Sequence, residues 1–222
     1  MIVFLGGLGT TRLMWDAQLA ALDDALALEL PGHGDAPPPS GVVTVETIAR
    51  DVLARAPDRF TFVGLSIGGM VGQWLGVHAP ERVERLVLAC TGAKLGERKD
   101  YDVRAQLVRR EGMEVVVECA KERWFTPAFR ETPRAQRILD AVRAVSREGY
   151  AACAEAVGAW DFRDELRGIA VPTLVVYGRD DPMTPAEVRA SLDGFDSVEI
   201  AGAHLAPVES PDEFNYHLRS PA

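Results

Sequence analysis

The chain of 222 residues has few cysteines, no long hydrophobic stretch and no cluster of basic residues. Its three cysteines, Cys90, Cys119 and Cys153, are odd in number and lack C-x-x-C spacing, which argues against a disulfide framework or a zinc knuckle and favours reduced thiols. No segment approaches the roughly 20 apolar residues that span a bilayer. The apolar segment Met1–Leu5 has no basic region before it and meets Gly6 at once, so no signal peptide is expected.

Basic side chains are also outnumbered, which excludes two classes of partner. The sequence holds 24 Lys and Arg against 33 Asp and Glu, a formal net charge of −9. Nucleic acids and anionic membrane surfaces bind basic faces, so we expect neither as a partner. Hydrophobic residues at 47% and charged residues at 26% are typical of a globular domain. The sequence therefore predicts a cytoplasmic protein with one sizeable core and a small-molecule partner.

Short apolar runs alternate with segments of helical periodicity along most of the chain. The apolar runs predict strands over Ile2–Leu5, Ala25–Leu30, Phe60–Leu65, Val83–Ala89, Pro172–Tyr177 and Ser197–Ala201. The periodic segments predict helices over Trp15–Leu22, Val45–Ala56, Ile67–His78, Pro185–Leu192 and Pro207–Leu218. This alternation indicates an α/β fold with a mainly parallel sheet flanked by helices.

One long segment departs from the alternation. Between about Glu97 and Gly168 only helical patterns occur, interrupted by glycine and proline. We therefore expect residues 1–96 and 169–222 to form an α/β core. Residues 97–168 are expected to be a helical lid inserted over one edge of the sheet, within one structural unit.

Ser66 lies in the sequence Gly64-Leu65-Ser66-Ile67-Gly68, a G-x-S-x-G pattern between a predicted strand and a predicted helix. In that context the turn forces the serine into a strained backbone conformation, and a Cβ on either flanking glycine would clash. The hydroxyl then projects above the sheet, at the N-terminal end of the helix. A purely structural turn is the alternative, and the strand–helix context favours a nucleophile.

A serine nucleophile needs a base, and the base needs an orienting acid. His204 is the one histidine that follows a predicted strand downstream of a candidate acid. Asp180 and Asp181 both follow the strand Pro172–Tyr177, and either can supply the carboxylate. The other histidines are predicted to stabilise a turn or to lie at the surface: His33, His78 and His217.

The oxyanion hole of such a site uses backbone N–H groups. The candidates are Ile67, which follows the serine, and Leu8, in the glycine-rich loop Gly6–Thr10. This loop does not match G-x-G-x-x-G, so a dinucleotide is not expected. No cluster of residues has metal-ligand spacing, and the sequence predicts neither metal nor cofactor.

The segments Gly6–Asp16 and Leu30–Gly34 resemble α/β-hydrolases. More narrowly, the chain resembles 3-oxoadipate enol-lactonases over nearly its whole length. The segments that carry this resemblance are Gly64–Gly76, Pro80–Leu88, Arg123–Phe129, Glu148–Ala151 and Trp160–Asp161.

The resemblance implies hydrolysis of an enol-lactone in aromatic degradation, without metal or cofactor. Ser66 would attack the ring carbonyl, His204 would take its proton and the backbone N–H groups of Leu8 and Ile67 would bind the oxyanion. The family pattern Gly-x-x-Asp followed by Thr-Pro favours Asp181 as the acid, with Asp180 as the alternative. Carboxylesterases, perhydrolases and C–C hydrolases share this fold and triad, and a non-catalytic binder is the alternative from another class.

The substrate that the resemblance implies carries a second carboxylate, which needs a local cation. Arg12, Arg123 and Arg130 are the candidates, and Trp124 is a candidate pocket residue. Each arginine has an alternative interpretation as a solvated surface side chain, and Trp124 has one as a core residue.

Members of the resembled family begin with a β-hairpin that precedes the strand equivalent to Ile2–Leu5. Without this hairpin, Ala25–Leu30 would form an apolar edge of the sheet, and such edges tend to pair. We expect a second subunit or a rearranged terminus to cover this strand.

Overall fold

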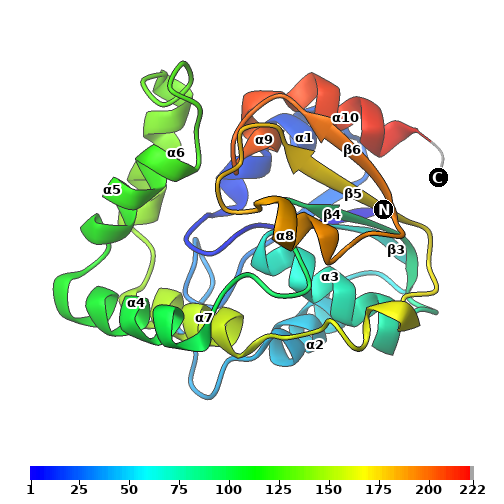
Figure 1. Cartoon of the computed structure of the whole chain (residues 1–222), viewed down its shortest axis with the longest axis horizontal. Coiled ribbons are helices and arrows are strands. Elements are labelled where there is room, and N and C mark those ends of the chain that lie inside the picture. The colour runs from blue at the N-terminus through cyan, green and yellow to red at the C-terminus, as the bar shows by residue number, and fades with distance from the viewer. Residues whose placement is uncertain (221–222) are drawn as a thin grey trace.

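A computed structural model describes residues 1–220 as a six-stranded sheet with helices on both faces (Figure 1). All neighbouring strands are parallel, in the order β2-β1-β3-β4-β5-β6. The last two residues of the predicted core segment 169–222 lie outside the described residues. The strands are β1 (Ile2–Leu5), β2 (Ala25–Leu28), β3 (Phe60–Leu65), β4 (Val83–Ala89), β5 (Thr173–Gly178) and β6 (Asp196–Ile200).

The central strands are apolar on both faces because helices cover both. Side chains along a strand alternate between the two faces, so Val3 and Phe4 of β1 enter separate hydrophobic clusters. Phe4 packs on Trp15 with ring centroids 4.9 Å apart, and Trp15 contacts Phe214 at 5.9 Å. The opposite cluster contains Val3 and residues of the helices that follow β2 and β3.

The helices around the sheet begin close to the predicted positions. They are the 3-10 helix η1 (Arg12–Trp15) and helices α1 (Asp16–Ala21), α2 (Val45–Arg55), α3 (Ile67–His78), α8 (Ala186–Ala190), α9 (Ala206–Glu209) and α10 (Pro211–Arg219). Thr44 and Thr47 form a capping box at the start of α2. The prediction of a single helix over Pro207–Leu218 is wrong. The helix is interrupted at Ser210, because Pro211 inside a continuous helix would clash with the preceding turn.

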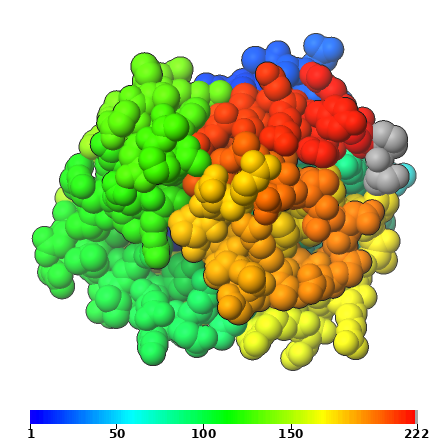
Figure 2. All heavy atoms as spheres, turned by 45° about the horizontal axis from the view of Figure 1, so that its top comes forward, coloured from blue at the N-terminus to red at the C-terminus, as the bar shows by residue number. Residues whose placement is uncertain are grey.

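Helices alone fill the chain between β4 and β5. These are α4 (Arg98–Glu111), α5 (Glu114–Arg123), α6 (Pro133–Arg143), α7 (Arg147–Ala159) and the short 3-10 helix η2 (Leu166–Gly168). Helices α4 to α7, which we call the lid helices, lie to one side of the core in green and yellow-green (Figure 1). Figure 2 shows their atoms against the gold and red atoms of the C-terminal segments, with a narrow hollow between them.

Two glycines let the lid helices approach the core closely. A Cβ on Gly32 would lie 2.6 Å from the Cα of Gly149, and a Cβ on Gly149 would lie equally close to the Cα of Gly32. The backbone N–H of Ser146 donates to the Gly32 carbonyl at 2.9 Å in the same contact. Any larger side chain at either glycine would push α7 away from the loop that follows β2.

Strand β2 is an edge of the sheet and pairs only with β1 among the described residues. Ala25, Leu26 and Ala27 are half-buried, and Leu28 is buried. Cover of this edge by a second subunit stays a prediction. The three cysteines are free thiols, as expected. Across residues 1–220, no helix has the length and apolar character needed to cross a membrane.

Candidate active site

Ser66 occupies the sharp turn between β3 and α3. Its φ of 57° and ψ of −115° place a non-glycine residue in a strained region. A Cβ on Gly64 would lie 2.1 Å from the carbonyl oxygen of Gly68, and one on Gly68 would lie 2.4 Å from the Leu5 carbonyl oxygen. Both glycines are therefore required by close backbone approach, as the pattern predicted. The Thr91 hydroxyl donates to the Ser66 carbonyl at 2.8 Å and fixes the turn.

The two predicted oxyanion donors lie beside this serine. Ile67 is the first residue of α3, and Leu8 lies in the loop after β1. Within residues 1–220, neither backbone N–H donates to another protein group. The loop holds its shape because Thr10 donates to the Gly7 carbonyl from both its backbone N–H, at 3.0 Å, and its hydroxyl, at 2.8 Å. Two unused amides near one hydroxyl are what an oxyanion hole requires.

His33 forms a hydrogen bond with the same loop. Its Nδ1 lies 2.9 Å from the Pro31 carbonyl, and the Gly9 N–H donates to its Nε2 at 3.0 Å. Nδ1 therefore carries the proton and Nε2 accepts. Burial lowers the pKa of His33 to about 4, so the ring is neutral near pH 7. The predicted turn stabiliser thus also anchors the loop that holds Leu8.

We expect this histidine to make folding stability depend on pH. The unfolded chain binds the proton near pH 6.5 and the folded chain only near pH 4, so acid favours the unfolded state between these values. The depression corresponds to roughly 3 kcal/mol. Urea unfolding at pH 7 and pH 4 should show wild type losing about this much more stability than His33→Gln, which keeps an acceptor but does not titrate. Equal losses in the two proteins would contradict the assignment.

Asp181 and His204 form a buried pair at the carboxyl ends of β5 and β6. His204 Nδ1 lies 3.0 Å from Asp181 Oδ2, and the side chains are 4% and 0% exposed. The Met183 N–H donates to Oδ1 at 2.8 Å, and the Thr184 hydroxyl donates to Oδ2 at 2.7 Å. Burial alone would raise the pKa of Asp181, but His204 and these hydrogen bonds outweigh it and lower the pKa. Asp180 is exposed and forms no hydrogen bond with His204 among the described residues.

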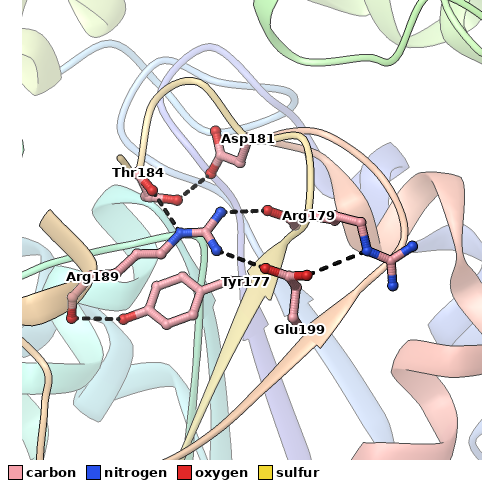
Figure 3. Close-up of polar contacts among 7 residues, drawn as sticks. Tyr177, Arg179, Asp181, Thr184, Arg189 and Glu199 are labelled. Atoms are coloured by element: carbon pink, nitrogen blue, oxygen red, sulfur yellow. Dashed lines mark hydrogen bonds and ion pairs between the residues drawn. The ribbon is translucent and has the colours of Figure 1, made fainter. Parts of the chain in front are cut away.

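Arg189 of α8 clamps the loop 179–184 that carries Asp181 (Figure 3). Its Nε donates to the Thr184 carbonyl and another guanidinium nitrogen donates to the Gly178 carbonyl, both at 2.7 Å. A third nitrogen reaches Glu199 of β6 at 3.0 Å. The guanidinium thus joins both ends of the loop and ties them to the neighbouring strand. No sequence motif marks this residue, because its contacts depend on how α8 packs.

Hydrogen bonds join the loop that carries His204 to the segment between the lid helices α5 and α6. The Glu209 carboxylate accepts from the Ala203 N–H at 2.9 Å, from the Thr126 N–H at 3.1 Å and from the Thr126 hydroxyl at 2.5 Å. The Leu205 N–H also donates to the Trp124 carbonyl at 2.9 Å. The position of His204 is therefore coupled to the segment that follows α5.

Ser66 and His204 line one cavity of about 250 Å³ beneath the lid helices. No hydrogen bond joins their side chains in the described chain, and catalytic hydrogen bonds often tighten only when substrate binds. The walls are mostly apolar. They include Leu8, Leu65, Leu107, Val108, Val115, Val116, Trp124, Tyr150 and Met183.

The four predicted substrate-binding residues separate into two groups. Trp124 and Arg123 line the cavity. Arg12 does not: it is exposed, pairs with Asp35 at 2.6 Å and lines a different surface groove. Arg130 pairs with Glu122 outside the cavity.

Arg104 of α4 was missed by sequence reasoning, yet it lines the cavity. The pattern of α4 is that of a charged surface helix, so nothing in the sequence separates Arg104 from the other arginines of that helix.

Cys90, Asp181 and His204 offer three possible metal-ligand atoms within 4.8 Å of one another, a grouping that spacing in the sequence did not indicate. Metals bind the thiolate, however, and burial raises the pKa of the Cys90 thiol well above its usual range. The Asp181 oxygens are already used by three donors. The arrangement fits a hydrogen-bonded cluster better than a metal centre.

Comparison with known proteins agrees with this geometry. The model of the "Alpha/beta hydrolase family" matches residues 2–215. The chain is 34% identical to 3-oxoadipate enol-lactonase 2 of Acinetobacter baylyi, over 99% of this chain and 87% of that protein. The crystal structure of the enol-lactonase from Burkholderia xenovorans is 33% identical with a TM-score of 0.91, covering 98% of this chain and 88% of that one. A thermophilic esterase from Thermogutta terrifontis is 27% identical with a TM-score of 0.89, over 98% and 87% of the two chains. The fold, the turn at Ser66 and these matches together show that the chain belongs to the α/β-hydrolase family.

Proposed function

We propose that the protein is a serine hydrolase that opens small esters or lactones, with Ser66 as nucleophile, His204 as base and Asp181 as orienting acid. The observation that carries this proposal is the buried Asp181–His204 pair, whose histidine lines the same cavity as the strained Ser66. The cavity has a volume of about 250 Å³, which suits a small substrate.

The roles follow from the geometry. Ser66 Oγ attacks the carbonyl carbon and passes its proton to His204 Nε2, while Asp181 stabilises the resulting imidazolium through Nδ1. The backbone N–H groups of Leu8 and Ile67 donate to the oxyanion. When the tetrahedral intermediate collapses, the C–O bond breaks and His204 protonates the leaving oxygen.

Water then completes the reaction. His204 removes a proton from a water molecule that attacks the acyl-enzyme, and the acid is released as Ser66 regains its proton from His204. In a lactone the leaving oxygen and the acyl group belong to one molecule, so the opened chain stays attached until this step.

For the specific substrate we propose 3-oxoadipate enol-lactone, which gives 3-oxoadipate. The enol-lactonases among the relatives support this choice, because the similarity to them extends over nearly the whole chain and includes the lid helices. A carboxylesterase is the second candidate, favoured by the likeness to the Thermogutta esterase and by the apolar walls.

Ultraviolet turnover of 3-oxoadipate enol-lactone, generated in solution, tests the specific proposal. We expect fast loss of its absorbance with wild-type protein and none above background with Ser66→Ala. Labelling by a fluorophosphonate without lactone turnover would leave a serine hydrolase with another substrate. If the folded protein showed no labelling and no turnover, that result would favour a non-catalytic binder.

A further inference from the structure

Arg104 is a charged side chain in a cavity whose walls are mostly apolar. It projects from α4 and lines the same space as Ser66 and His204. Its guanidinium carbon lies 5.5 Å from the centre of the Tyr101 ring. Leu107 and Val108, on the next turn of the helix, line the cavity beside it.

No carboxylate neutralises this guanidinium. Across residues 1–220, Arg104 forms no ion pair, and the polar residues Tyr101, Cys119 and Tyr150 line the cavity with it. Burial raises the pKa of Tyr150 to about 12, so its hydroxyl is uncharged near neutral pH. An arginine stays protonated at every ordinary pH. A half-buried positive charge therefore faces the cavity, in a protein whose net charge is −9.

The other charged groups of the cavity do not cancel Arg104. Asp100 lies one turn earlier on α4 and is exposed, and Arg123 of α5 is also exposed. Besides His204, these three residues are the charged groups that line the cavity. A partly desolvated cation that has no ion pair is stabilised when an anion joins it, and a carboxylate matches the guanidinium fork.

We propose that Arg104 binds a carboxylate carried by the substrate while Ser66 attacks the carbonyl carbon in the same cavity. The site then selects acyl chains that end in a carboxylate over neutral chains of the same size. This inference rests on the proposed function and assigns the anion-binding role to α4, where the sequence had pointed to Arg12, Arg123 and Arg130.

Matched pairs of para-nitrophenyl esters test it. One member is the hemisuccinate, hemiglutarate or hemiadipate, and its partner has an isopropyl group in place of the terminal carboxylate. We expect wild type to prefer the acid at one chain length or more. In Arg104→Gln, kcat/KM for that acid should fall about 10- to 100-fold, as for loss of a charged hydrogen bond, with the neutral ester changed less than about threefold.

The variants are chosen to separate charge from folding. Arg110→Gln removes an exposed arginine of the same helix that pairs with Glu111 and should change neither ester. Arg104→Lys keeps the charge and should retain part of the preference. Fluorophosphonate labelling at the wild-type rate shows that each variant keeps a formed site.

The outcomes distinguish this inference from the proposed function. Turnover that depends on Ser66 but shows no preference for the acids, or an equal loss for both esters in Arg104→Gln, would overturn the inference alone. Loss of the preference in Arg123→Gln instead of Arg104→Gln would also overturn it. Absence of turnover that depends on Ser66 would contradict the proposed function and the inference together.

Discussion

Replacing Ser66 by alanine is expected to lower kcat by about 10⁶-fold, the scale of losing a triad nucleophile. The reason is chemical, because Ser66 is the residue at the turn between β3 and α3 and lines the same cavity as His204. Thr91 is close, but its hydroxyl donates to the Ser66 carbonyl at 2.8 Å and is buried. Single-turnover and steady-state rates on a para-nitrophenyl ester provide the measurement.

The fold should tolerate this change. Alanine keeps a Cβ and therefore the same backbone strain at φ 57°, and the serine hydroxyl makes no hydrogen bond within residues 1–220 that would be lost. We expect the thermal midpoint to stay within a few degrees of wild type. Ser40→Ala, in an exposed loop, is the matched control and should keep full activity. A Ser66→Ala protein with activity within tenfold of wild type would refute the nucleophile assignment.

Replacing Asp181 by asparagine is expected to lower kcat by about 10⁴-fold, because the imidazole of His204 loses both its orienting acceptor and the charge that stabilises its protonated form. The asparagine side chain is nearly the same size as that of aspartate, so the fold should remain. The lowered pKa of Asp181 keeps this carboxylate ionised at neutral pH.

Asp180 provides a control that differs by one position. It is exposed, whereas Asp181 lies 3.0 Å from His204. Asp180→Asn should change kcat less than about threefold, since surface substitutions away from a site have small effects. If Asp180→Asn were the inactive variant and Asp181→Asn the active one, the assignment of the acid would be wrong.

The strands and the order of the site residues could be predicted because local sequence determines them. The boundaries predicted for β1, β3 and β4 agree with the structure. Gly6 ends the apolar run of β1, and charged Arg59 and Arg82 precede the runs of β3 and β4. Ser66 follows from glycines whose Cβ atoms would clash, and His204 follows from its place after a strand. Both signals lie within a few residues of the side chain concerned.

The arginines show what the sequence does not determine. Whether Arg12, Arg104 or Arg130 enters the cavity depends on helix packing and on which acids compete for each guanidinium. Arg12 forms an ion pair with Asp35. Arg130, in the loop that follows α5, forms an ion pair with Glu122. Arg104 has no acidic partner within the described residues, and only the three-dimensional arrangement of α4, α5 and α7 shows this.

His33 is a second example of packing that the sequence does not reveal. Its role in a turn could be predicted, but its hydrogen bond to Gly9 joins loops that are 24 residues apart. Arg189 is a similar case. Its three hydrogen bonds hold the loop 179–184, and they form only because α8 packs beside that loop. In both cases a side chain outside the predicted triad holds a loop of the site: His33 holds the loop with Leu8, and Arg189 holds the loop with Asp181.

The central claim is that Ser66 is a nucleophile activated by His204 and Asp181, and its most direct test is covalent. Wild type, Asp181→Asn and Ser66→Ala are treated with a fluorophosphonate, and the modified peptides are identified by mass spectrometry. The account predicts one adduct per chain, on Ser66, formed much more slowly in Asp181→Asn and absent in Ser66→Ala. An adduct on another residue, or none on folded wild-type protein, would contradict it.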